Sequence, residues 1–177
     1  MNRLQDPTLI SRGSMLIAGP IVSCRGVGYE HLELLRSQSE RVLCDVGQWV
    51  GLTDRYSVGF SSVPKDAHTP MLTCTDGLEH MVIVGFEVQD LHGLPVGVVG
   101  IALPATTYAV FTHTGSPVSM LEETIRPAYR WVRDSQLELN GAFDVEHENE
   151  DFLDKGLNPL ARSYFWLPVR NAVAESV

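Results

Sequence analysis

Four polar and aromatic side chains in the C-terminal third of the chain have the spacing of a binding surface. Asp144 and Glu146 are two residues apart, and so are Tyr164 and Trp166. Residues two apart on a strand point to the same face. If the two strands lie close together, one face carries two carboxylates and two large rings. Each ring attracts an organic cation by about 0.5 to 2 kcal/mol, and a cation would offset the cost of burying a carboxylate.

Further side chains are candidates for lining the same site: Glu87, Tyr56, Phe60, Tyr108 and Trp131. Glu87 is flanked by apolar residues, which favours burial with a partner. Each candidate also has a structural interpretation. Glu146 begins an acidic run, 146–151, and such runs are usually solvated, whereas the aromatic side chains could belong to an ordinary core.

Other chemistries lack their sequence signals. The six histidines form no His-x-x-x-His pair and no cluster with the three cysteines, so we expect no metal site and no disulfide framework. Gly26-Val-Gly28 lacks the third glycine of a dinucleotide site, and there is no Gly-x-Ser-x-Gly nucleophile turn. We therefore assign no catalytic residue and expect no cofactor.

Composition limits the possible partners. The chain has 177 residues and a net charge of −9, without a stripe of Lys and Arg, so a nucleic-acid partner is disfavoured. No apolar run is long enough to span a bilayer, and the first residues do not resemble a signal peptide. We expect a cytoplasmic protein whose partner is a small molecule rather than a membrane; a homodimer or a protein partner is also possible.

Hydrophobic periodicity predicts an α+β chain. Residues 1–13 show no periodicity and are expected to be a flexible arm or an expression remnant, with one domain over 14–177. The expected strands are 15–24, 56–60, 80–88, 96–103, 106–113, 142–147 and 163–169, and the expected helices are about 29–50 and 118–132. Pro127 should kink or break the second helix.

The order of strand, Gly-rich turn, helix, strand and strand occurs twice. The apolar faces of the two helices match in spacing: Leu32, Leu35, Val42 and Val46 correspond to Val118, Leu121, Ala128 and Val132. The repeat suggests two pseudo-symmetric halves, about 14–103 and 104–170. Two half-sheets that meet in this way would leave a ligand cleft between them.

An ordered set of short phrases resembles a known family. They are Tyr108-Ala-Val-Phe-Thr-His-Thr-Gly115, the helix ending in Trp131, Val84-Gly-Phe-Glu-Val88 and Tyr164-Phe-Trp-Leu-Pro-Val169. Together they resemble the GyrI-like or AraC-type effector-binding domain, which is SOUL-like and forms the drug-binding part of multidrug-sensing regulators. The resemblance implies two βαββ units with two long helices around a central cleft, small-molecule binding (often of organic cations), and here a stand-alone member without a DNA-binding domain.

The chain departs from the family pattern at the acidic position. The family's Glu in the last strand is Tyr164 here, and its Glu-x-Tyr is Asp144-x-Glu146. We expect a binding module for a cationic or amphipathic molecule rather than an enzyme. The alternatives are a hydrolase with Glu146 as base and Tyr164 or Tyr108 polarising the substrate, and a protein inhibitor that uses the acidic loop.

Overall fold

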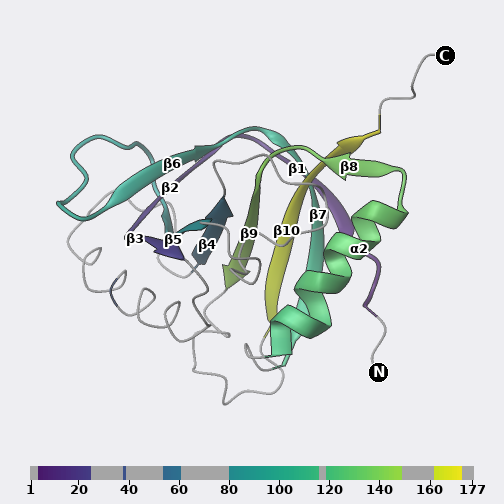
Figure 1. The fold of residues 1–177 in the computed structure, drawn as a ribbon. Helices are drawn as coiled ribbons and strands as arrows, with labels where there is room; N and C mark the ends of the chain where they lie inside the picture. Colours follow the sequence, from purple (N-terminus) through teal and green to yellow (C-terminus); the bar gives the residue numbers. More distant parts are fainter. Residues whose placement is uncertain are drawn as a thin grey trace.

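The computed structural model describes residues 4–24, Gln38, 54–60, 80–115, 119–148 and 162–172. The strands are β1 (Thr8–Arg12), β2 (Met15–Gly19), β3 (Ile21–Cys24), β4 (Arg55–Phe60), β5 (His80–Glu87), β6 (Val99–Leu103), β7 (Thr106–Thr114), β8 (Leu137–Leu139), β9 (Phe143–Glu148) and β10 (Arg162–Asn171). One helical segment joins a π-helical turn, η2 (Leu121–Ile125), to α2 (Arg126–Asp134) (Figure 1). The predicted α+β class is confirmed for these residues.

The strands form one antiparallel sheet. Its order is β1-β7-β10-β9-β4-β5-β2-β6, with β3 beside β5 and β8 beside β10. Strands β3, β5 and β4 pair side by side, and β7, β10 and β9 pair in the same antiparallel way. The pairing of β4 with β9 joins these two sets of three strands. The first predicted helix, about 29–50, lies outside the described residues apart from Gln38. The pseudo-symmetric repeat with two long helices therefore stays a prediction.

The second predicted helix changes its type beside Pro127. A π-helical turn ends at Ile125, and Pro127 lies in the first turn of α2. Proline has no N–H to donate, and it is best tolerated in the first turn of a helix. The helical segment is continuous from Leu121 to Asp134, so the structure shows a change of helix type beside Pro127 and no break there. In the described part of the chain, no helix is long and apolar enough to cross a membrane.

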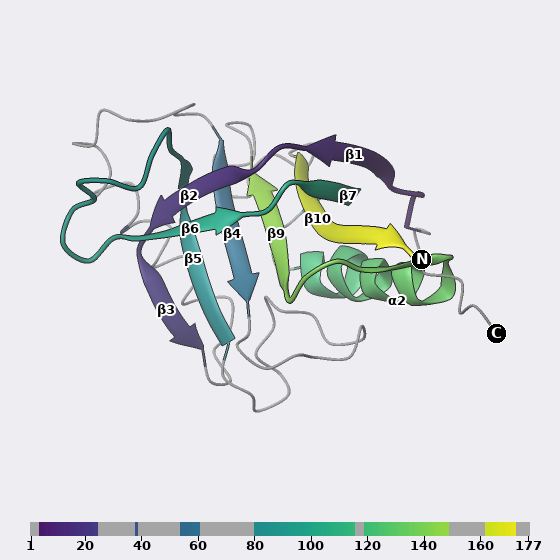
Figure 2. The ribbon, with the colours of Figure 1, turned by 90° about the horizontal axis from the view of Figure 1, so that it is seen from above.

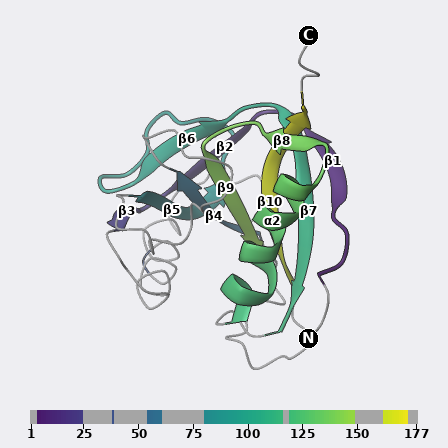
Figure 3. The ribbon, with the colours of Figure 1, turned by 45° about the vertical axis from the view of Figure 1, so that its right-hand side comes forward.

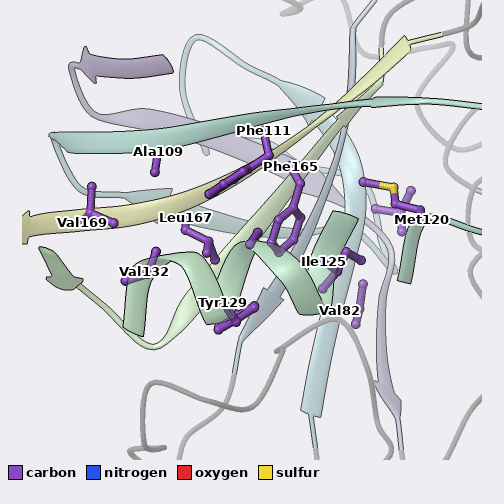
Figure 4. Packing of buried hydrophobic residues seen from close by; sticks show 12 residues of the cluster. Val82, Ala109, Phe111, Met120, Ile125, Tyr129, Val132, Phe165, Leu167 and Val169 are labelled. Carbon is purple, nitrogen blue, oxygen red and sulfur yellow. The ribbon is translucent and has the colours of Figure 1, made fainter. Parts of the chain in front are cut away.

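One apolar cluster fills the space between α2 and the sheet. Ala128, Tyr129 and Val132 of α2 pack against Phe111 and Phe165, among other residues of β5, β7 and β10 (Figure 4). Burying a phenylalanine fully is worth about 1.5 to 3 kcal/mol. Figure 3 shows α2 running along β10 and β7, and this contact fixes one face of these strands inside the protein.

The opposite face of the sheet is covered by two of its own strands. β2 and β6 pair with each other and run across β4, β5 and β9 at a large angle (Figure 2). Met15, Ile17 and Leu103 from this ribbon pack against Val58 and Val145. The crossing is close, because a Cβ atom at Gly85 would collide with the carbonyl group of Ala18. This second cluster continues into the aromatic residues described below.

The N-terminal arm is one point at which the sequence prediction is wrong. Residues 8–12 form β1, whose five residues pair with β7 from Thr8↔Val110 to Arg12↔Thr106. Most of its side chains are exposed, so β1 is held by backbone pairing at the sheet edge and has no hydrophobic pattern to reveal it. The short strand β8 is also absent from the prediction, and β6 begins three residues later than 96–103 because Gly97 adopts a positive φ of 88° in the preceding turn.

Candidate functional site

The register of β9 decides which side chains share a face. Tyr164 pairs with His147, and Trp166 pairs with Val145. Directly paired residues project to the same side of a sheet. Asp144 and Glu146 therefore point to the opposite side from Tyr164 and Trp166, and the prediction of two acids and two rings on one face is wrong. The physical reason is the one-residue offset of the register, which exchanges the two faces of a strand.

The aromatic residues meet on the face that β2 and β6 cross. We call Tyr56, Tyr108, His147, Tyr164 and Trp166 the aromatic cluster. The Tyr56 ring stacks on His147 with centroids 4.8 Å apart, and His147 stacks on Tyr164 at 5.7 Å. Trp166 meets His147 at 5.2 Å and Tyr108 at 5.6 Å, both at steep angles. Such tilted and offset pairs are the favoured geometries of aromatic rings.

The charged side chains of Arg12 and Glu87 lie at the edge of this cluster. The Arg12 guanidinium carbon lies 5.3 Å from the centroid of the Trp166 ring, which is a cation–π distance. Arg12 also lies 3.6 Å from the Glu87 carboxylate, and its charge acts to lower the pKa of Tyr56 against the larger effect of burial. The Arg12 and Glu87 side chains are 35% and 21% exposed, whereas Tyr56, Tyr108 and Trp166 are at most 5% exposed. Solvent therefore reaches the site at the two charged residues.

Burial shifts the acid–base properties of the cluster. Loss of hydration raises the pKa values of Tyr56 and Tyr108 to about 12, and the Glu87 charge adds to the shift at Tyr56. Burial lowers the pKa of His147, although Asp54 acts in the opposite sense. The His147 Nε2 to Asp54 distance of 3.4 Å is an ion pair only when His147 is protonated. The tyrosines are thus neutral phenols, and His147 favours its neutral form.

Besides His147 Nε2, which lies 3.4 Å from Asp54, two buried polar atoms of the cluster have no hydrogen-bond partner among the described residues. They are the Tyr108 hydroxyl and the Trp166 indole nitrogen. A buried polar group without a partner costs about 1 to 3 kcal/mol. These two atoms could be satisfied by a polar group of a bound molecule.

The acidic residues of β9 lie on the helix side of the sheet and are buried there. The Tyr129 hydroxyl donates a 2.7 Å hydrogen bond to Asp144. Arg55 donates two hydrogen bonds to the Glu148 carboxylate, at 2.9 and 2.7 Å. Glu146, between them on the same face, is 1% exposed. These carboxylates lie within the core of the fold, away from the aromatic cluster.

The predicted site residues therefore divide between the two faces. Those on the face of the aromatic cluster are Tyr56, Phe60, Glu87, Tyr108, Tyr164 and Trp166. Those on the other side are Asp144, Glu146 and Trp131; the last packs against Phe111 and donates to Asp6. His147 and Arg12 were not predicted. The apolar alternation Phe143, Val145, His147 could have indicated the first, but no local pattern marks the second.

No metal centre emerges from these residues. Within residues 4–24, 54–60, 80–115, 119–148 and 162–172, no three His, Cys, Asp or Glu side chains are grouped as metal ligands would be. The aromatic cluster offers flat apolar rings, with the carboxylates of Glu87 and Asp54 and the guanidinium of Arg12 beside them. Such a set can hold an amphipathic organic molecule by stacking and charge.

Comparison with known sequences finds a matching family of small-molecule-binding domains. The model of the GyrI-like small molecule binding domain matches residues 67–170, which is more than half of the chain. The transcriptional regulator BrlR of Pseudomonas aeruginosa is 30% identical over 91 residues, covering 51% of this chain and 33% of BrlR. The chain thus spans about a third of the length of the relative that it matches.

Solved structures share the fold at low sequence identity. SAV2435 bound to tetraphenylphosphonium superimposes with a TM-score of 0.66 at 13% identity, covering 94% of both chains. The EcmrR C-terminal domain gives a TM-score of 0.67 at 13% identity, covering 93% of this chain and 97% of that domain. These matches extend the likeness beyond residues 67–170 to nearly the whole chain.

Proposed function

Since this chain belongs to the GyrI-like small molecule binding domain family, we propose that its aromatic cluster binds a cationic, amphipathic organic molecule. The ligand's apolar part would stack on Trp166 and Tyr56, and its positive charge would lie near the Glu87 carboxylate. The site would act as a sensor or a sequestering module, related to the effector domains of transcription regulators. No step of this proposal requires a cofactor.

One observation carries the proposal: a cationic side chain of the protein itself, Arg12, already lies over the Trp166 ring. The Arg12 guanidinium lies over Trp166 at 5.3 Å and beside Glu87 at 3.6 Å. An organic cation at the same position would have the same ring and the same carboxylate as partners. Cation–π attraction is worth about 0.5 to 1 kcal/mol at an exposed site and about 2 kcal/mol or more when the cation is desolvated. The fold is similar to that of SAV2435, whose structure holds tetraphenylphosphonium, and this similarity also supports a positively charged ligand.

The unpartnered polar atoms add a second requirement for the natural ligand. The Trp166 indole nitrogen is only a donor, and the Tyr108 hydroxyl can donate or accept. A ligand that also carries a carbonyl, ether or hydroxyl oxygen would relieve the cost of leaving these atoms buried and unpaired. We therefore infer a ligand with an aromatic or aliphatic body, one positive charge and one acceptor group.

The direct test is calorimetric titration with tetraphenylphosphonium. Wild type should bind it saturably, and Glu87→Gln should weaken binding by about threefold to tenfold because the counter-charge is lost. The matched control is Glu138→Gln, which removes one negative charge from an exposed position on β8. A second control, Trp131→Phe, changes a ring on the helix side of the sheet.

If Glu87→Gln and Glu138→Gln lost equal affinity for tetraphenylphosphonium, the ligand's positive charge would not lie beside Glu87. Turnover of a bound ester or amide, followed by the appearance of product, would instead favour the hydrolase alternative. Absence of binding to any lipophilic cation, together with co-purification of a protein, would favour the partner-binding alternative. If the protein is a sensor, it should bind the ligand without converting it into a product.

A further inference from the structure

The rings of the aromatic cluster are covered in this structure, so a ligand must displace something to reach them. Tyr108 is fully buried, and Tyr56 and Trp166 are 3% and 5% exposed. Among the described residues, two groups cover this face: the β2–β6 ribbon, and Arg12 at the end of β1. The question is which of the two gives way.

The β2–β6 ribbon is firmly held. Met15, Ile17 and Leu103 are each at most 2% exposed and belong to the second apolar cluster. Gly19 and Gly85 also allow the backbones of β2 and β5 to come too close for a Cβ atom. Moving the ribbon would expose this packed surface to water, which is unfavourable in proportion to its area.

Arg12 is held much more weakly. Its side chain is 35% exposed, its distance to Glu87 is 3.6 Å, and β7 is the one described strand that pairs with β1. Ion pairs at exposed positions contribute little because water screens them and both side chains lose freedom. An arginine side chain can also swing into solvent without any movement of its strand, since it has several rotatable bonds.

The charge of Arg12 reaches four members of the aromatic cluster. Its guanidinium lies over Trp166, and its charge acts electrostatically on Tyr56, Tyr108 and His147. The only carboxylate paired with it among the described residues is Glu87. Arg12 therefore has the partners that an external organic cation would need.

We propose that Arg12 determines the ligand specificity of this site, because its guanidinium occupies the position that the ligand's cationic group takes on binding. This inference rests on the proposed function. A ligand binds only if its contacts exceed those that Arg12 gives up. The site therefore rejects small cations and selects bulky, apolar ones, which stack on more of the ring surface than a guanidinium does.

The test compares Arg12→Ala with wild type by calorimetric titration. Tetraphenylphosphonium should bind about tenfold tighter to Arg12→Ala, since the competing cation is gone and Glu87 is unpaired. Tetramethylammonium should bind to Arg12→Ala and not detectably to wild type. The control Arg170→Ala removes the same charge from an exposed pair with Glu138 on β8 and should change either affinity by less than about twofold.

A ligand of the same shape and opposite charge distinguishes the loss of the Arg12 charge from the space that its side chain leaves. Tetraphenylborate has nearly the shape of tetraphenylphosphonium with the opposite sign. It should bind more weakly to Arg12→Ala than to wild type, because the attraction of the guanidinium is lost. Arg12→Lys keeps the charge and should retain the wild-type order of affinities. Circular dichroism of each variant checks that it is folded.

The outcomes distinguish this inference from the proposed function. Equal or weaker tetraphenylphosphonium binding to a folded Arg12→Ala would overturn the role of Arg12 while the binding function stands. An equal gain in the affinity of Arg12→Ala for the phosphonium and the borate would also overturn the role of Arg12. The gain would then come from the space that the arginine side chain leaves, and its charge would not be the cause. No binding of the phosphonium to either protein would overturn the proposed function itself, and this inference with it.

Discussion

The Tyr129 hydroxyl donates a 2.7 Å hydrogen bond to the Asp144 carboxylate in the interior of the protein. This bond joins α2 to β9 on the side of the sheet away from the aromatic cluster. The residue before and the residue after Asp144, Phe143 and Val145, pack on the aromatic side. β9 thus supplies structural polar contacts from one face and part of the candidate binding site from the other.

Removing that hydroxyl should destabilise the fold. We expect Tyr129→Phe to lower the free energy of unfolding by about 1 to 3 kcal/mol, because the buried carboxylate loses a donor. Urea denaturation measures the change. Tyr164→Phe, at a half-buried ring on the other face, is the matched control. An effect of Tyr129→Phe no larger than that of the control would show that the bond adds nothing to stability.

The buried ion pair between Arg55 and Glu148 should matter more than an exposed pair. We expect Arg55→Met to cost about 3 to 5 kcal/mol, because it removes the cation that pairs with the buried Glu148 carboxylate at 2.7 Å. Arg170→Met breaks the exposed pair with Glu138 and should cost about 0 to 1 kcal/mol. The double variant Arg55→Met, Glu148→Met should recover part of the loss. Similar unfolding midpoints for the two single variants would contradict the assigned difference.

Burial of His147 should make stability depend on pH. Because burial lowers its pKa in the folded protein, the unfolded chain binds a proton more readily below about pH 6.5. The stabilising contribution is therefore present above that pH and is lost as pH falls through the folded-state pKa. His147→Phe keeps a ring between Tyr56 and Tyr164. In this variant the free energy of unfolding should fall less steeply as the pH is lowered. Parallel curves of unfolding free energy against pH for the two proteins would rule this out.

The close crossing of β2 and β5 should not tolerate a side chain. We expect Gly85→Ala to destabilise the protein by about 1 to 3 kcal/mol or more, because its Cβ atom would overlap the Ala18 carbonyl. Gly13→Ala is the control, since no atom lies within 4 Å of the Cβ position there. Thermal unfolding of both variants provides the comparison. A Gly85→Ala protein with wild-type stability would mean that the ribbon moves easily, which would also weaken the argument that Arg12 is the group displaced.

The sequence by itself determined the α+β class, the approximate positions of the strands from 15 onward apart from β8, and the family. Strong apolar alternation, as in Tyr108–His113, is a local property and can be read without knowing the partner strand. An irregularity at Pro127 was equally predictable, since proline lacks the N–H that a regular helix interior needs, and the helix changes from π to α beside it.

Only the tertiary structure decided which residues form the site. Two alternating sets of side chains, Asp144, Glu146 and Glu148 against Phe143, Val145 and His147, were both visible in the sequence. Strand register selects the face that each set occupies, and register depends on pairing between residues far apart in the chain. Arg12 entered the site for the same reason: its place over Trp166 depends on the pairing of β1 with β7, which no local pattern specifies.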